Sequence, residues 1–244
     1  MNNAPLPLWQ QAADFALELM ETLAGVLPTG DLGLELTAEV NNATYQLTTA
    51  DPHGIELRVD DKPAFRFEID YRLVTNTRGD WLKVQRSSFA VVPDGTGAPF
   101  FRYDFDVDAR SVPRAHLNVH GHRDDMIEAL LGGTSSRSKS RRQRYLKEGR
   151  LPRLSNFHFP LGGQRMRPCI EDVLEVVASE LNIDVRADFE QVLQNGRERY
   201  RRKQLQAAVR DSPSAAAEAL ASLGYDVTMP ANPAVDHSEW LRLV

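Results

Sequence analysis

The chain has 244 residues, of which 42% are hydrophobic and 26% charged, and it carries a formal net charge of -5. This length is enough to bury a substantial core, and the mildly acidic balance excludes a protein that binds nucleic acid over its whole surface. The single cysteine, Cys169, excludes an intrachain disulfide and a zinc site built from several cysteines.

Segment 5–27 is predicted to form the first helix, because its apolar residues recur at helical spacing and Pro28 follows them. Acidic residues at positions 14, 18 and 21 interrupt the apolar run, which argues against a secretory signal peptide. No stretch is apolar enough to span a membrane. We therefore expect a cytoplasmic protein that makes no membrane contact.

Segment 33–121 alternates between apolar and polar residues, which is typical of β-strands. Short turns rich in Asn, Asp, Pro and Gly separate the alternating runs and favour an antiparallel meander. Within 65–73 the apolar residues share one face and the charged residues the other, so the curved sheet is predicted to have a core face and a polar face. About seven strands are predicted, over 33–40, 44–49, 54–59, 65–75, 81–92, 100–107 and 115–120.

The segment after the sheet is rich in Ser and Arg. We expect a short helix over 124–131 and a last strand over 155–159. Between them, a flexible basic loop over 134–153 has too few apolar residues to pack and leaves room for one helical turn near 143–147. A second basic run covers 197–203. Dense cations with interleaved tyrosines suit the backbone of RNA or another nucleic acid. The candidate nucleic-acid contacts of the loop are Arg137, Lys139, Arg141, Arg142, Arg144, Lys147, Arg150 and Arg153.

The region 168–223 is predicted to be helical, with a weak point at Asn195 and Gly196 and with Ser212 as the N-cap of its last helix. Residues 1–229 then form a single α+β domain with an N-terminal helix, the sheet and a C-terminal helical region. The predicted helices cover 168–181, 187–209 and 213–223. The remaining tail, 230–244, ends in side chains expected to dock on the body or on a protein partner, namely Trp240, Leu241 and Leu243.

The hairpin over 100–122 carries the densest set of acid–base groups in the chain. If its turn centres near Arg110, Asp104 lies opposite His116 and Arg102 lies opposite Asn118. A carboxylate beside an imidazole raises its basicity, and an arginine can hold a phosphate, which suits metal-free RNA cleavage through the 2′-hydroxyl. His116 is expected to be half exposed. The candidate catalytic residues are His116, Asp104, His120 and Arg102, with His116 or His120 as the base.

A metal site is the alternative explanation of the histidines. His120 and His122 lie two residues apart, a spacing that zinc, copper and iron sites use, and His158 and Asp104 are candidates for further ligands. A solvated polar strand face is the more frequent explanation of such a pattern, so no metal and no cofactor are assigned. Cys169 precedes a predicted helix without a histidine partner in sequence, and we interpret it as a packed thiol.

Three short motifs occur in order: Arg102-Tyr103-Asp104, then Pro113 with His116-Leu117, then His158-Phe159-Pro160. This layout resembles the TumE-like toxins of toxin–antitoxin loci and uncharacterised bacterial domains near phage-defence genes. The resemblance covers the middle quarter of the chain and implies a toxin-like or defence-associated role that involves Arg102, Asp104, His116 and His158. The rival hypothesis is a non-enzymatic interaction subunit of a bacterial multi-protein complex.

Overall fold

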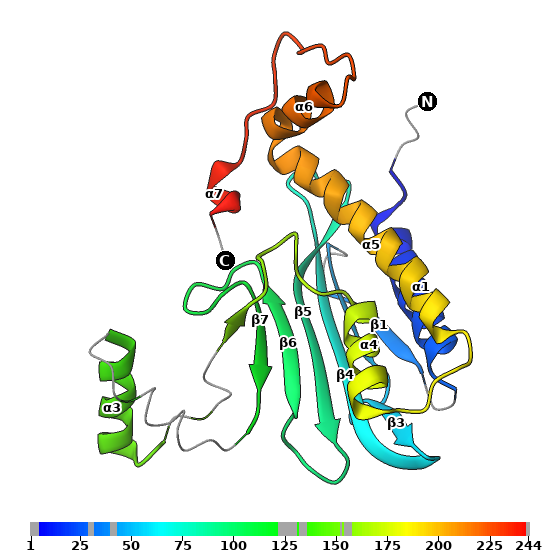
Figure 1. Ribbon diagram of the computed structural model, residues 1–244, viewed down its shortest axis with the longest axis vertical. Coiled ribbons are helices and arrows are strands. Elements are labelled where there is room, and N and C mark those ends of the chain that lie inside the picture. Colours follow the sequence, from blue (N-terminus) through cyan, green and yellow to red (C-terminus); the bar gives the residue numbers. More distant parts are fainter. Residues whose placement is uncertain are drawn as a thin grey trace.

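The computed structural model describes residues 5–28, 32–39, 43–121, 131, 136–151, 153 and 158–242. It confirms the α+β expectation, with an N-terminal helix, one antiparallel meander-like sheet and a C-terminal helical region (Figure 1). The sheet has eight strands. The eighth is a two-residue strand, β8 (Phe159–Pro160), which shares only Phe159 with the last strand predicted over 155–159. No helix among these residues is long and apolar enough to cross a lipid bilayer.

The strand order is β1-β2-β4-β5-β6-β7-β8, and β3 pairs with β4 beside this path. The two longest strands, β4 and β5, form the middle of the sheet, and β4 bends strongly at one end (Figure 1). Apart from β8, the strands lie within three residues of the predicted ends. Their bounds are β1 (Leu34–Ala38), β2 (Thr44–Thr49), β3 (Ile55–Val59), β4 (Lys62–Thr75), β5 (Leu82–Pro93), β6 (Phe101–Asp106) and β7 (Ala115–Val119).

Three helices cover the apolar face of the sheet: α1 (Leu8–Val26), α4 (Ile170–Leu181) and α5 (Phe189–Asp211) (Figure 1). The apolar side chains that alternate along the strands pack against the apolar faces of α1 and α4 and form one core. Its fully buried side chains include Leu23, Leu47, Phe67, Val91 and Leu174. The polar residues of the strands therefore lie on the opposite face, where the candidate site is found.

The expected flexible loop over 134–153 is instead largely helical, because α3 spans Ser136–Glu148. Low apolar content suggested a loop, but Arg, Lys, Gln, Leu and Glu are all good helix formers, and they make up most of this segment. Of the predicted helix over 124–131, the described residues include only Leu131, which is helical. Most of the predicted strand over 155–159 lies outside the described residues.

Gly196 was expected to weaken the second C-terminal helix, yet α5 runs through it without a break. A Cβ atom at this position would collide with the carboxyl group of Glu171 on α4. Glu171 is itself buried, so the two helices cross closely where α5 has no side chain. Gly196 is therefore a packing residue. Glycine lowers helix propensity, but its lack of a side chain allows the two helices to approach closely.

The chain after α5 forms a C-terminal arm, which we define as residues 212–242. It contains α6 (Pro213–Ser222) and α7 (Ser238–Leu241), and α6 lies beyond the end of the sheet (Figure 1). Ser212 occupies the predicted N-cap position, but its side chain makes no capping hydrogen bond. The Asp236 carboxylate caps α6 instead, because it accepts hydrogen bonds from the Ser214 backbone N–H at 3.0 Å and from the Ser214 hydroxyl.

Candidate functional site

The register of β5, β6 and β7 brings the predicted site residues together. Asp104 on β6 lies opposite His116 on β7, and Arg102 lies opposite Asn118, as expected from the hairpin. On the other side of β6, Ser88 of β5 lies opposite Asp104. Because these residues share the polar face, their side chains can meet across three strands.

The Asp104 carboxylate is the centre of this group. Its Oδ1 accepts a hydrogen bond from the Ser88 hydroxyl at 2.8 Å. Its Oδ2 accepts one from Arg102 Nε at 2.7 Å and one from Asn118 Nδ2 at 2.9 Å. His116 Nε2 lies 3.6 Å from the same oxygen. We call these five residues the Asp104 network, and it fixes the carboxylate in one orientation.

His116 is buried, so the expectation of a half-exposed residue is wrong. Its side chain is 7% exposed. Its Nδ1 lies 2.7 Å from the Pro113 carbonyl oxygen, and the His158 ring meets it edge to face, with ring centres 4.6 Å apart. Both nitrogens of His116 thus face groups of the protein itself. A substrate can reach this imidazole only by displacing them, which favours His120 over His116 as the candidate base.

His120 is the more accessible histidine. It follows β7, and its backbone N–H donates to the Phe100 carbonyl at 2.9 Å, so the strand pairing continues to this residue. Burial lowers the pKa of His120, the Arg102 and Arg153 guanidiniums lower it further, and the Asp104 carboxylate acts against them. The imidazole is therefore neutral at neutral pH, the state in which it can accept a proton.

Arg102 presents a guanidinium whose orientation Asp104 fixes. Only its Nε is hydrogen-bonded to a described residue, so both Nη groups are available to other acceptors, and the side chain is 42% exposed. Glu68 of β4 belongs to the same row of the sheet, through Ala90 of β5. Burial raises the pKa of Glu68, and Arg102 acts against that shift. The guanidiniums of Arg102 and Arg153 thus lie near His120 at this edge of the polar face.

The predicted nucleic-acid contacts lie on or next to α3. Lys139, Arg144 and Lys147 are exposed, and Arg141 is half-buried. None of these four makes an ion pair with a residue that the structure describes. Arg142 donates to the Leu131 carbonyl. The helix also contains Arg137, while Arg150 pairs with Glu148 at 3.6 Å. Tyr145 is exposed between the cations, so α3 offers positive charge together with an aromatic surface.

The second basic run, on α5, differs in this respect, because all five of its cations are paired. Arg197 contacts Asp172 at 2.7 Å, and Lys203 contacts Glu18 of α1 at 2.6 Å. The remaining pairs are Arg199 with Glu18, Arg201 with Asp172 and Arg202 with Glu198. Glu18, Asp172 and Glu198 are thus shared among the five cations, and the pairs with Glu18 and Asp172 join α5 to α1 and α4. The two runs look alike in sequence, but each α5 cation contacts a carboxylate, whereas Lys139, Arg144 and Lys147 of α3 contact none among the described residues.

Of the two histidines in the predicted metal pair, the structure describes His120. Within the described residues no three His, Cys, Asp or Glu side chains are close enough to hold a metal ion. His122, one half of the predicted pair, lies outside the described residues. Cys169 is buried, and burial together with Glu171 and Asp172 raises the pKa of its thiol far above the usual value. The thiol is therefore protonated and packed, as expected from its sequence context.

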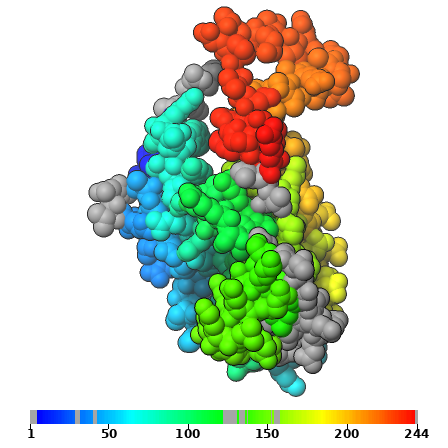
Figure 2. All heavy atoms as spheres, turned by 90° about the vertical axis from the view of Figure 1, so that its left-hand side faces the viewer, coloured from blue at the N-terminus to red at the C-terminus, as the bar shows by residue number. Residues whose placement is uncertain are grey.

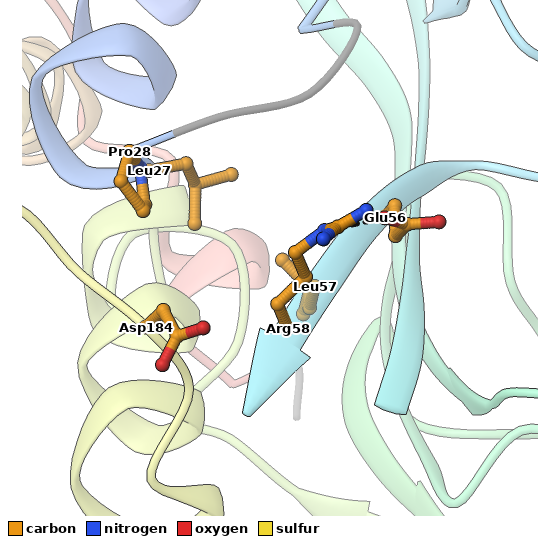
Figure 3. A pocket seen from close by; sticks show the side chains of 6 residues that line it. All are labelled: Leu27, Pro28, Glu56, Leu57, Arg58 and Asp184. Atoms are coloured by element: carbon orange, nitrogen blue, oxygen red, sulfur yellow. Dashed lines mark hydrogen bonds and ion pairs between the residues drawn. The ribbon is translucent and has the colours of Figure 1, made fainter. Parts of the chain in front are cut away.

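One hollow lies on the opposite, helix-covered side, and Figure 3 shows the side chains around it. It is lined by Leu27, Pro28, Glu56, Leu57, Arg58 and Asp184. The Asp184 carboxylate accepts hydrogen bonds from the backbone N–H groups of Asp60 and Asp61, and Arg58 pairs with Glu56 at 2.7 Å. Its charged side chains are thus bound to the protein, and the hollow supplies no reactive group.

Two members of the site were not predicted from the sequence. Ser88 binds Asp104, and Glu68 lies in the row of Arg102. Both belong to strands in which polar and apolar residues alternate, so their position on the polar face was predictable. Which residues they face depends on the register of β4, β5 and β6, and the β-bulge near Arg72 in the β4–β5 pair makes that register hard to infer.

The predicted tail contacts are exposed, with Trp240 at 41% and Leu241 at 64%, while Leu243 lies outside the described residues. His237 stacks on Trp240 with ring centres 4.1 Å apart.

No family model matches the chain, and comparison with curated proteins and with solved structures finds no significant relative. The likeness to TumE-like toxins therefore depends on the short motifs around Arg102, Pro113 and His158 alone.

Proposed function

We propose that the protein is an RNA-directed nuclease of a toxin-like or defence-associated kind, which cleaves by metal-independent acid–base chemistry. The observation that supports the proposal is the combination of an accessible His120, whose pKa is lowered, with an Arg102 guanidinium held by Asp104. A neutral base beside a fixed cation is what phosphodiester cleavage through a neighbouring hydroxyl requires.

In the proposed reaction His120 removes the proton of a ribose 2′-hydroxyl while O2′ forms a bond to phosphorus. The bond from phosphorus to the 5′-oxygen breaks, and that oxygen takes a proton from water. The products are a 2′,3′-cyclic phosphate and a 5′-hydroxyl, and His120 returns its proton to solvent. The two free Nη groups of Arg102 stabilise the negative charge that develops on the phosphoryl oxygens.

Each member of the Asp104 network has a role in this scheme. Asp104 directs the Arg102 Nη groups away from itself, while Ser88 and Asn118 hold the carboxylate. His116 supports the other side of the carboxylate. The exposed cations of α3, with Tyr145, bind the RNA backbone and bring a phosphodiester to Arg102.

The test is incubation of the purified chain with labelled RNA in a buffer that contains a chelator. The proposal predicts fragments ending in a 2′,3′-cyclic phosphate, and it predicts that an oligonucleotide with a single 2′-deoxy residue is not cut at that residue. Expression of the chain alone is expected to arrest bacterial growth. Cleavage of the 2′-deoxy position would contradict the mechanism, and intact RNA after prolonged incubation would contradict the proposal.

A second candidate is a non-enzymatic interaction subunit, and one observation favours it. The outer side of α1 exposes Trp9 at 60% and Leu17 at 55%, with Met20 on the same stripe, and Leu6 is exposed just before the helix. A stripe at this spacing suits a partner helix. If the protein is such a subunit, Trp9→Ser with Leu17→Ser is expected to abolish its co-purification with products of neighbouring genes. Circular dichroism checks that the fold is retained.

A further inference from the structure

The C-terminal arm has almost no core of its own. Ser212 is its only buried residue within the described chain, and α6 has none. By contrast, its large apolar side chains are exposed, some by more than half, and those on or next to α6 are Leu220, Leu223 and Tyr225. A polar contact ties the far end of the arm back to α5, since the His237 N–H donates to the Asp211 carbonyl, and Asp236 with Ser214 closes the arm on itself.

Such an arm requires a partner surface. The α6 helix has ten residues, and an isolated helix of that length is marginal in water because most helical stability in proteins comes from packing. A run of exposed apolar side chains of this extent marks an interaction surface. Further members of the run are Leu205 and Val209 on α5, and Met229 and Val235 in the segment before α7.

The charge of the arm indicates which surface it fits. The arm carries the carboxylates of Glu218, Asp226, Asp236 and Glu239 against the single cation Arg242, so its partner is basic. The outer side of α3 is a basic surface on which Lys139, Arg144 and Lys147 have no ion pair with a described residue. That surface also exposes apolar groups, since Leu146 is 80% and Tyr145 42% exposed. Charge and apolar character of α3 thus both complement those of the arm.

The two surfaces lie at opposite ends of the molecule, with α6 at the upper end and α3 at the lower end (Figures 1 and 2). They cannot meet within one chain in this conformation. Two chains placed antiparallel about a two-fold axis bring the arm of each copy to α3 of the other, so both contacts form at once. We propose that the RNA-free chain forms this antiparallel homodimer, in which α3 of each copy packs against the C-terminal arm of its partner, so that the arm and RNA compete for α3.

The experiment measures the molar mass of the full chain by light scattering during size-exclusion chromatography, at low salt and high micromolar concentration. The proposal predicts a mass of twice the 27.4 kDa chain. Reversing three α3 charges (Lys139→Glu, Arg144→Glu, Lys147→Glu) halves this mass, and so does reversing three arm charges (Glu218→Lys, Asp226→Lys, Glu239→Lys). The variant that combines both sets restores the dimer, since the charges are exchanged rather than lost.

The same molar-mass measurement is applied to control variants. Lys62→Glu at the start of β4 leaves the mass unchanged, whereas Leu220→Asp with Leu223→Asp gives a single chain. Circular dichroism establishes that each variant is folded. A wild-type chain that is monomeric throughout would overturn the proposal. So would a dimer that survives both charge reversals, or a combined variant that stays monomeric.

Discussion

Arg102 Nε donates a 2.7 Å hydrogen bond to Asp104 Oδ2, and this contact decides which atoms of the guanidinium face away from the network. A lysine at the same place would carry the charge without the orientation, because its ammonium group has no equivalent of the Nε–Nη arrangement. The bond also makes Asp104 a positioning residue. Its effect on RNA cleavage is exerted through Arg102, which gives the first prediction.

Asp104→Asn is expected to lower the rate constant for RNA cleavage by about 10-fold to 100-fold, because the neutral amide binds Arg102 weakly and lets it move. RNA binding, measured by fluorescence anisotropy, is expected to change little, since α3 supplies most of the charge. The matched control is Asp70→Asn on the same face, where Asp70 pairs with Arg86 at 3.0 Å outside the network. Equal losses in the two variants would remove the special role of Asp104.

The lowered pKa of His120 gives the second prediction, a pH profile. Cleavage needs the neutral imidazole, so the rate is expected to rise with pH through a value below the usual His pKa of about 6.5 and to be constant at neutral pH. Arg153→Ala removes one cause of the lowered pKa and is expected to move the rising limb to higher pH. A limb that does not move in this variant would contradict the assignment of His120.

The same shift has a consequence for stability. A histidine whose folded-state pKa is depressed contributes stability above its unfolded-state pKa, and this contribution is lost as the pH falls through the folded-state value. Urea unfolding at a series of pH values is expected to show this acid-side loss in the wild type and less of it in His120→Ala. The loss lies below a pH of about 6.5.

Gly196→Ala is expected to destabilise the fold by about 1–3 kcal/mol, because a Cβ atom there collides with the buried Glu171 carboxyl group. Helix propensity alone predicts the opposite sign, a gain of about 1 kcal/mol. Gln194→Ala, at an exposed position of the same helix, is the control and is expected to be nearly neutral. Thermal unfolding compares the three chains, and a more stable Gly196→Ala variant would refute the proposed close packing.

The cations of α3 and α5 are expected to differ in RNA binding. Lys139→Ala with Arg144→Ala removes two exposed, uncompensated charges and should reduce the salt dependence of binding, with a slope change of about 0.7 per lost phosphate contact. Arg201→Ala with Arg202→Ala removes paired charges and should leave the slope unchanged. Titrations at several salt concentrations measure both slopes. If the α5 variant showed the larger change, the assignment of RNA binding to α3 would be wrong.

Much of the fold could be predicted because its signals are local. Alternation in the strands and Pro28 after α1 are properties of neighbouring residues, and the Asp104–His116 pairing followed from one short turn. The α3 helix was missed because low apolar content was taken as a sign of a loop, although helix propensity depends on other properties of the side chain. The role of Gly196 was missed because it depends on Glu171, which is distant in sequence.

The chemistry of the site was less predictable than its position. Sequence spacing placed His116 and His120 on one face and left either as the base. Their different accessibility depends on Pro113 and His158, which contact His116 from outside the β6–β7 strand pair. Likewise, the two basic runs are similar in composition, and only the positions of Glu18, Asp172 and other distant carboxylates distinguish them. Tertiary contacts of this kind cannot be inferred from periodicity.

The most direct test of the account is a single-turnover measurement of RNA cleavage in chelator-containing buffer, comparing wild type with His120→Ala and with His53→Ala. His53 is an exposed histidine outside the Asp104 network and is the matched control. The account predicts a loss of about 100-fold to 10,000-fold for His120→Ala, the usual effect of removing a general base, and an unchanged rate for His53→Ala. A His120→Ala variant that cleaves RNA at the wild-type rate would contradict it.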